Sequence, residues 1–237
     1  MALTLAMLRK ELILPAVRRS GGELAGLFLP GRRAMPDRVA LFIDAQNVLQ
    51  AARRCFHAGA AIHHTDGQID PLALGSLICD RPPPGRTRIL SEVRIYTGRP
   101  DSTKQPKTYG AHMRQCEAWE RAGAIVIPRA LRYPREWPAE RAEQKGVDVE
   151  LAIDFIAGAI DRRYDAGILF STDTDLRPAL EFVAERFEHY PRAEAAAWRA
   201  PGANRALRVR GSRRTWVHFL DHDDYQTVRD HTDYLLP

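Results

Sequence analysis

Short apolar runs alternate with longer helical patterns along most of this chain of 237 residues. The clearest run covers residues 39–43, is apolar throughout and ends in Asp44. Such a run is typical of a parallel strand buried on both faces, since helices cover both sides of a parallel sheet. Further strands are expected at 89–96, 124–127, 167–170 and 194–198. The alternation predicts an α/β fold with a central, mostly parallel sheet flanked by helices.

Capping residues and prolines mark where the helices begin and end. The spacing predicts helices over 47–57, 71–79, 106–122, 147–160 and 176–187. Asp70 is suited to cap the second helix, with Pro71 at its first position. Gly123 is a typical stop for the third helix. Prolines and arginines predict an irregular segment over 128–141.

Composition excludes several classes of protein. No apolar run approaches the length of a membrane span, so no membrane partner is expected. The three cysteines are scattered, which argues against a secreted disulfide scaffold and predicts a cytoplasmic protein. The net charge of +5 comes mostly from the first 34 residues, which hold six basic and two acidic side chains. The rest is almost neutral, so bulk charge does not identify a partner.

Carboxylates follow two of the predicted strands. Asp44 ends the first strand, and Asn47 begins the helix after it. The strand at 167–170 runs into Ser171-Thr172-Asp173-Thr174-Asp175. Parallel strands end at the same edge of a sheet, and ligands bind beyond that edge, near the point where the strand order reverses. We therefore expect these acidic segments to converge.

A third acidic segment belongs to the predicted helix at 147–160. Asp148 shares a helical face with the apolar Leu151 and Phe155, so it is expected at the end of the buried face, turned toward the sheet edge. Glu150 and Asp154 lie on roughly the opposite face, and we expect both to be solvated.

The negative charges of clustered carboxylates must be offset for the cluster to be stable. Two of them about 4 Å apart repel by roughly 4 kcal/mol at an effective dielectric near 20, so protons or a cation must offset the charge. Carboxylate and amide oxygens suit Mg²⁺ or Mn²⁺ rather than zinc, and such an ion can activate water against a phosphate. Taken singly, Asp173 could instead form an Asx turn and Asp175 could cap the helix at 176–187. The prediction depends on the three segments together.

The segments Leu41-Phe42-Ile43-Asp44-Ala45-Gln46-Asn47, Lys145-Gly146-Val147-Asp148 and Ser171-Thr172-Asp173-Thr174-Asp175-Leu176 resemble, in order and spacing, the three motifs of the NYN domain. This family is a branch of the PIN-like nuclease superfamily. The resemblance implies a Rossmann-like, three-layer fold, an acidic pocket that binds Mg²⁺ or Mn²⁺, and ribonuclease activity. One departure is visible, because Thr172 stands where many relatives have glycine, which could alter how closely a phosphate approaches the turn.

The resemblance also implies roles for individual residues. Asp44, Asp148 and Asp173 would be catalytic as metal ligands or as activators of the attacking water. Asp175 would be a nearby metal-binding residue that acts through water, and Asn47 would orient substrate or a ligand.

Candidate substrate contacts are weaker. Lys145 directly precedes the helix of Asp148, Arg99 follows a strand end, and Thr172 lies in the acidic turn. Seven arginines lie between 192 and 214, near Trp198 and Trp216. These arginines either contact phosphates while the tryptophans stack on bases, or form a solvated surface over core tryptophans. A zinc site built from the histidines and cysteines at 55–79 is disfavoured by their spacing. The histidines and aspartates at 218–231 are expected to serve capping and solvation.

The leading hypothesis is a metal-dependent endoribonuclease that hydrolyses phosphodiester bonds of single-stranded or structured RNA. Two alternatives stay open: an RNA-binding or regulatory protein without turnover, and a DNA-directed metal-dependent nuclease. Three parts are expected: an N-terminal extension at 1–36 that is disordered or precedes the true start, the NYN/PIN-like catalytic domain at 37–190, and the C-terminal part of the same domain at 191–237. The sequence does not indicate an oligomeric state.

Overall fold

The computed structural model describes residues 35–59, 62–203, 205–209 and 215–236, so the expected N-terminal extension lies almost wholly outside the described residues. The described strands form one six-stranded sheet, and all of them are parallel. The strands are β1 (Asp37–Asp44), β2 (Arg88–Arg99), β3 (Ile125–Ala130), β4 (Ala166–Phe170), β5 (Arg192–Trp198) and β6 (Val217–Leu220). The helices are α1 (Ala45–Phe56), α2 (Pro71–Asp80), α3 (Pro106–Ala122), α4 (Val147–Ile160), α5 (Arg177–Arg186) and α6 (His222–Val228), with a 3₁₀ turn η1 (Thr174–Leu176).

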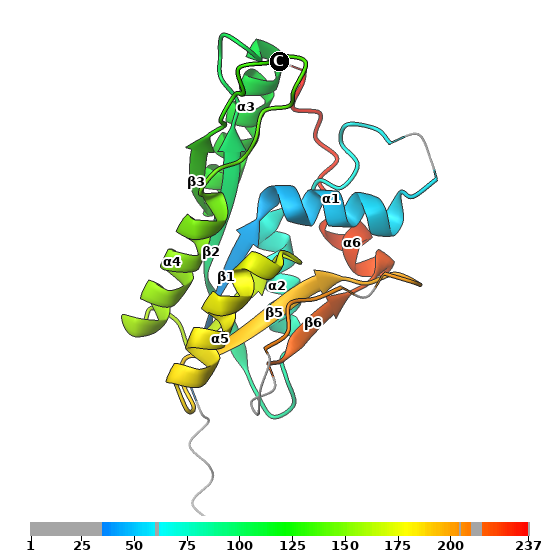
Figure 1. Ribbon diagram of the computed structural model, residues 1–237. Coiled ribbons are helices and arrows are strands. Elements are labelled where there is room, and N and C mark those ends of the chain that lie inside the picture. Colours follow the sequence, from blue (N-terminus) through cyan, green and yellow to red (C-terminus); the bar gives the residue numbers. More distant parts are fainter. Residues whose placement is uncertain (1–34, 60–61, 204, 210–214, 237) are drawn as a thin grey trace, which may run out of the picture. The chain divides into compact units, whose positions relative to one another are not determined.

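The predicted fold class is confirmed, and the sheet is parallel throughout its described length. Its strand order is β3-β2-β1-β4-β5-β6. The chain builds outward from β1 to β3, then returns to place β4 on the other side of β1 (Figure 1). The strand order therefore reverses between β1 and β4, which is where ligands bind in open sheets of this kind.

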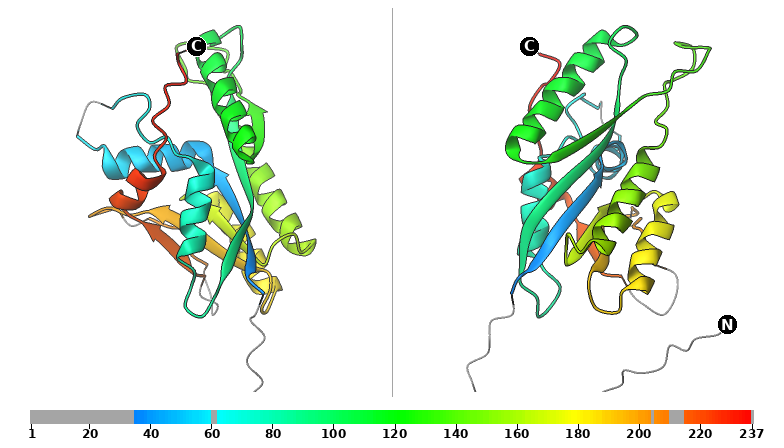
Figure 2. Two further views of the ribbon diagram at one scale, coloured as in Figure 1. Left: turned by 180° about the vertical axis from the view of Figure 1, so that it is seen from behind. Right: turned by 90° about the vertical axis from the view of Figure 1, so that its left-hand side faces the viewer.

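Helices cover both faces of the sheet, as the right-hand view of Figure 2 shows. On β1, Val39, Leu41 and Ile43 pack with α1, α2, α3 and α6. Ala40 and Phe42 pack with α4 and α5. Successive side chains on a strand point to opposite faces, so Asp44 continues the face of Phe42, toward α4. The alternation of side chains along β1 therefore places the Asp44 carboxylate on the side of the sheet that α4 and α5 cover.

Several predicted boundaries agree with the structure. The helices at 106–122 and 147–160 have the predicted limits, and Gly123 ends α3 in the left-handed conformation with a φ of 107°. Asp70 caps α2 by accepting hydrogen bonds from the N–H groups of Leu72 and Ala73. The helix predicted at 176–187 begins instead as η1 and continues as α5.

Two other expectations about secondary structure were wrong or incomplete. The predicted irregular segment begins too early, because β3 continues through Pro128 to Ala130. β3 lies at the edge of the sheet, where proline is tolerated because a missing N–H need not break a ladder. The sequence also gave no prediction of β6, which is short and adds to the other edge. Asp221 caps α6 in a reciprocal capping box with Asp224, as expected for this acidic segment. The expected solvation was wrong for His218 and Asp224, which are both buried.

The predicted solvation of Asp154 and Glu150 was also wrong. The Tyr96 hydroxyl donates to Asp154 Oδ2 at 2.8 Å, and Arg94 Nη2 donates to the same oxygen at 3.0 Å. Glu150 pairs with Arg129. The face of α4 that carries these two carboxylates contacts side chains of β2 and β3. Asp154 and Glu150 therefore bind the helix to the sheet.

A buried charge cluster lies toward the opposite, amino-terminal edge of the sheet. Arg88 of β2 and Glu194 of β5 form an ion pair, and both side chains are almost fully buried. His218 Nε2 lies 2.8 Å from the second oxygen of Glu194. Burial opposes ionisation of Glu194, but the hydrogen bonds of His218 and Arg88 outweigh it, so the pKa of Glu194 is lowered. This cluster links β2, β5 and β6 through charge rather than apolar packing.

Within the described ranges, no helix is both long enough and apolar enough to cross a bilayer.

Candidate active site at the carboxyl edge of the sheet

Asp44 lies at the point where the strand order reverses, and both of its oxygens accept hydrogen bonds. The N–H of Asn47 donates to Oδ1 at 3.1 Å, so Asp44 caps α1. The hydroxyl of Ser171, the first residue after β4, donates to Oδ2 at 3.1 Å. The residue is buried, with 4% of its surface exposed. Asp44 therefore joins the ends of two neighbouring strands.

Further hydrogen bonds fix the turn after β4 against α1. The N–H and the hydroxyl of Thr172 both donate to Asn47 Oδ1, at 2.9 and 3.0 Å. The N–H of Asp173 donates to Ser171 Oγ at 3.1 Å. Asp173 itself caps η1 by accepting from the N–H of Asp175. The end of β1 with the start of α1, and the turn after β4, therefore form one hydrogen-bonded unit, although the partners of the bonds between them are at least 125 residues apart in the sequence.

Asp148 reaches the same region from α4. This helix contacts β1 and η1, and Leu151 and Phe155 are fully buried, as the helical pattern predicted. Gly146 precedes the helix with a φ of 76°, a left-handed conformation that glycine adopts without steric cost. Asp148 is the second residue of the helix and is half-buried. The glycine thus lets the chain enter α4 with the carboxylate near the turn after β4.

Burial and neighbouring carboxylates raise the pKa values of Asp44 and Asp148. Burial, followed by the charges of Asp148 and Asp173, raises the pKa of Asp44 to about 6. Burial, followed by the charges of Asp173 and Asp175, raises the pKa of Asp148. None of the ion pairs in the described part of the chain involves these four residues. The site therefore concentrates negative charge without a basic partner.

In metal-free buffer, we expect Asp44→Asn to be more stable than the unaltered protein near pH 8, by at most about 3 kcal/mol. The folded-state pKa of Asp44 is raised from 3.8 to about 6. Ionisation of Asp44 therefore destabilises the folded state above about pH 6, and this penalty disappears below about pH 4. Denaturant unfolding in EDTA at both extremes of this range measures the difference.

The matched control for this comparison is Asp161→Asn, since Asp161 is exposed at the far end of α4. Its effect on the free energy of unfolding should not vary with pH in the same way. A stability difference for Asp44→Asn that is the same at both pH values would contradict the prediction.

The donor chemistry of the site fits a hard divalent cation, although the coordination is not complete. Among the described residues, no group of three or more His, Cys, Asp and Glu side chains is arranged to hold a metal ion. Mg²⁺ differs from zinc in retaining several waters and using only one or two protein carboxylates together with phosphate oxygens. Asp44 and Asp148, which have no basic partner among the described residues, can supply the one or two carboxylates that Mg²⁺ needs.

The other predicted site residues lie at different distances from the carboxylates. Thr172 belongs to the hydrogen-bonded unit described above, and Asp175 is exposed beside it. Lys145 is exposed, with its Nζ 3.3 Å from Glu143 Oε2. Arg99 is exposed on β2, where its charge adds to the lowering of the pKa of His112 and opposes the rise that burial causes in the pKa of Cys116 on α3. It is therefore not brought to the carboxylates.

The arginine-rich stretch does not form one surface in the described residues. Arg192 pairs with Asp37, and Arg199 and Arg208 lie over the ring of Phe219. Trp198 is a core residue. The three arginines at 210, 213 and 214 lie outside the described residues.

Ser171 is the residue that the sequence analysis missed. Its fully buried hydroxyl joins Asp44 to the backbone of Asp173, yet it received no role as a candidate. The available signal was its position, since a small hydroxyl side chain directly follows the strand beside the one that ends in Asp44.

Comparisons with known proteins bear on the same region. A family model described as the NYN domain matches residues 38–188, a range that contains every residue of the hydrogen-bonded unit. None of the curated proteins matches this sequence. Among solved structures, a protein of unknown function from Vibrio parahaemolyticus is similar, with 16% identity and a TM-score of 0.49. That match covers 81% of this chain and 98% of the other.

Proposed function

This chain belongs to the NYN domain family, a family of PIN-like nucleases, and from that premise we propose that it is a metal-dependent ribonuclease. The main support for the proposal is that carboxylates from the end of β1, from the turn after β4 and from the start of α4 lie close together. None of them has a basic partner among the described residues. The site lies where the strand order of an open α/β sheet reverses, the usual place for a ligand.

In this proposal, Asp44, Asp148 and Asp173 bind Mg²⁺ or Mn²⁺, one or two of them directly and the remainder through waters of the ion. The exposed Asp175 also contributes through water. When bound, such an ion supplies a water of lowered pKa and neutralises charge on the phosphate. The chain's own contribution is orientation. Ser171 fixes one oxygen of Asp44, and Asn47 fixes the turn that carries Asp173.

Two residues beside the carboxylates are proposed to contact the phosphate of the RNA. Lys145 lies three residues before Asp148 and pairs with the exposed Glu143, a contact of little energetic value that an RNA phosphate can replace. The Thr172 hydroxyl lies in the turn after β4 and is the second contact that we propose. Arg99 lies beside α3, so we leave it out of the proposed site.

The direct test is incubation of the purified full chain with labelled single-stranded RNA, with structured RNA and with DNA of the same sequence. Each polymer is tested with Mg²⁺, with Mn²⁺ and with EDTA. We expect cleavage of RNA that requires the divalent ion and leaves a 5′-phosphate and a 3′-hydroxyl. RNA that is bound but never cut would favour the binding-protein alternative, and cleavage of DNA in preference to RNA would favour the DNA-directed alternative.

A further inference from the structure

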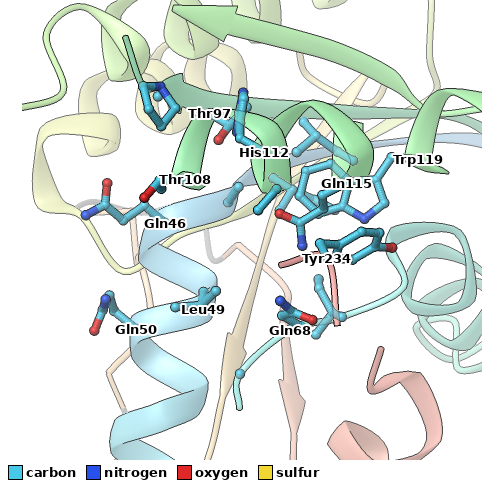
Figure 3. A pocket seen from close by; sticks show the side chains of 18 of the residues that line it. Gln46, Leu49, Gln50, Gln68, Thr97, Thr108, His112, Gln115, Trp119 and Tyr234 are labelled. Atoms are coloured by element: carbon cyan, nitrogen blue, oxygen red, sulfur yellow. The ribbon is translucent and has the colours of Figure 1, made fainter. Parts of the chain in front are cut away.

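A cavity of about 490 Å³ lies across β1 from the carboxylates. It is bounded by α1, by the carboxyl ends of β1 and β2, by α3 and by the C-terminal segment (Figure 3). Ile43 and Ile95 form its floor, on the face of the sheet opposite to that of Asp44. The C-terminal segment forms one wall and is held against α3, because Arg114 Nε and Nη2 donate to the carbonyl of Tyr234 at 2.9 and 2.6 Å. A volume of this size is typical of sites for small organic groups.

The lining of this cavity is mostly apolar, and most of its polar side chains are uncharged amides and hydroxyls. The Nε2 of the lining residue His64 lies 2.7 Å from Oδ1 of Asp233, which is not part of the lining. Five of the lining residues are glutamines, and none is Asp, Glu, Lys or Arg; the glutamines are Gln46, Gln50, Gln68, Gln115 and Gln144. Each side-chain amide offers both donors and an acceptor. Burial, and then the charge of Arg99, lower the pKa of His112 to about 4, so this lining residue is neutral at physiological pH. A charged ligand would lose its hydration here without gaining a counter-charge, which favours an uncharged one.

Two polar atoms of the lining residues lack partners. Gln68 Oε1, an acceptor, and Trp119 Nε1, a donor, are both buried without a hydrogen-bond partner among the described residues. Buried polar groups are rarely left unpaired in folded proteins. Both atoms are closed off in this structure, so we infer that the Gln68 and Trp119 side chains turn toward the cavity to pair with a ligand that supplies the complementary groups. Trp119 and Tyr234 also bring flat aromatic rings to this cavity (Figure 3).

We propose that this cavity binds one unstacked nucleobase of the RNA strand whose phosphate reaches the carboxylates. This inference rests on the proposed function and deepens it. A nucleobase is flat and uncharged and has donors and acceptors along its edge, which matches the rings and amides of the lining. Single-stranded RNA is recognised in this way, by stacking on aromatic side chains and hydrogen bonds to base edges, and glutamine is a typical partner of such edges.

The position of the cavity relative to the carboxylates supports the same assignment. α1 connects the two sites, because Asn47 belongs to the hydrogen-bonded unit at Asp44 while Gln46 and Gln50 line the cavity. Gln46 lies two residues after Asp44, so a nucleotide next to a phosphate at Asp44 is the one we expect to meet the cavity. The carboxylates would act on the backbone, which all nucleotides share, and the cavity would select which nucleotide is placed beside the cut.

The test uses the full chain labelled with ¹⁵N, in EDTA so that no RNA is cut. The probes are hexamers of adenosine, cytidine and uridine, the adenosine hexamer with one abasic position, and the three free nucleosides. Binding is followed at the indole N–H resonance of Trp119, which is assigned by its loss in Trp119→Phe. The variants are Gln68→Leu, which removes the unpaired acceptor at similar size, and the matched control Gln226→Leu, exposed on α6 and outside the lining.

We expect at least one hexamer to shift the Trp119 resonance and the abasic hexamer to shift it less. The Kd values of the strongest and weakest hexamers should differ by about tenfold, the discrimination that one base-edge contact provides. Gln68→Leu should reduce this preference to less than about threefold, whereas Gln226→Leu should leave it unchanged. Thermal unfolding of Gln68→Leu checks that the variant is folded. Trp119→Phe, in which binding is followed at the backbone amide resonances of the other lining residues, supplies a second, independent loss of base preference.

The proposal is overturned if hexamers bind while the Trp119 resonance stays in place, or if the base preference survives both Gln68→Leu and Trp119→Phe. It is equally overturned if neither hexamer nor nucleoside shifts the resonance, or if only free nucleosides do. Its failure is distinct from that of the proposed function. If RNA is cleaved but the Trp119 resonance does not shift on RNA binding, only the nucleobase site in the cavity is ruled out. If the resonance shifts in a base-dependent way but RNA is not cleaved with either Mg²⁺ or Mn²⁺, only the ribonuclease activity is ruled out.

Discussion

Replacement of Asp148 by Asn is expected to lower the rate of metal-dependent RNA cleavage by at least about 10³-fold, equivalent to about 4 kcal/mol of barrier. Asp148 is half-buried among the negative charges of Asp173 and Asp175, with no basic partner in the described residues. An amide has nearly the same shape as the carboxylate but no charge, so it weakens the hold on a divalent cation while fitting the same space. Initial rates of cleavage of a labelled RNA, with Mg²⁺ or Mn²⁺ varied, measure the effect.

Two further variants sharpen this experiment. Asp44→Asn should cause a loss of similar size, because the same site requires it, and it should not destabilise the metal-free protein. Asp161→Asn makes the same chemical change at the other end of α4 and should cleave RNA at the rate of the unaltered protein. If cleavage persists in both Asp148→Asn and Asp44→Asn, the carboxylates at the sheet edge are not the catalytic site.

Arg88→Met is expected to lower the free energy of unfolding by up to about 3 kcal/mol, because it removes the closer of the two arginines that pair with the buried carboxylate of Glu194. The second, Arg192, keeps its Nε 3.6 Å from Glu194 Oε1 and offsets part of the loss. Both side chains of this pair are almost fully buried. Arg88 and His218 lower the pKa of Glu194 despite its burial. The pair therefore contributes its full stabilisation above the ordinary pKa of a glutamate, and that contribution is lost as the pH falls through the lowered folded-state value. Urea unfolding near pH 7 measures the change.

A matched arginine shows whether burial causes the loss. Arg121 pairs with Glu117 on the surface of α3, where both side chains are largely exposed. Arg121→Met should therefore change the free energy of unfolding by less than about 0.5 kcal/mol. The double variant Arg88→Met, Glu194→Leu should recover part of the loss, because the buried charge is then absent. A loss for Arg88→Met as small as that for Arg121→Met would show that the buried pair contributes little.

The sequence predicted the placement of the carboxylates because that placement follows from strand periodicity. Asp44 ends an apolar run, and Asp173 lies three residues beyond another, so parallel strands bring both to one edge. The apolar face of α4 placed Asp148 in the same way. These inferences need only the repeat of two in a strand and of 3.6 in a helix.

Features that depend on distant partners could not be predicted from one sequence. The helical pattern placed Asp154 away from the buried face of α4, but it did not show that Tyr96 and Arg94 of β2 lie beside that face. Likewise, Ser171 looked like an ordinary turn residue until β4 was placed next to β1. The cavity combines α1, α3 and the C-terminal segment, and no local pattern indicates that these three elements meet.

The hydrogen bonds between the ends of β1 and β4 also have a consequence for the order in which the protein becomes active. β1 to β3 can pair with one another while the chain is still being synthesised, but Asp148 and Asp173 come later in the sequence. Contacts between residues more than 100 positions apart form slowly, because loop closure must precede them. A nascent or truncated chain that stops before β4 therefore holds Asp44 without Ser171, Thr172 or Asp173. We therefore expect the proposed nuclease activity to appear only after β4 has paired with β1.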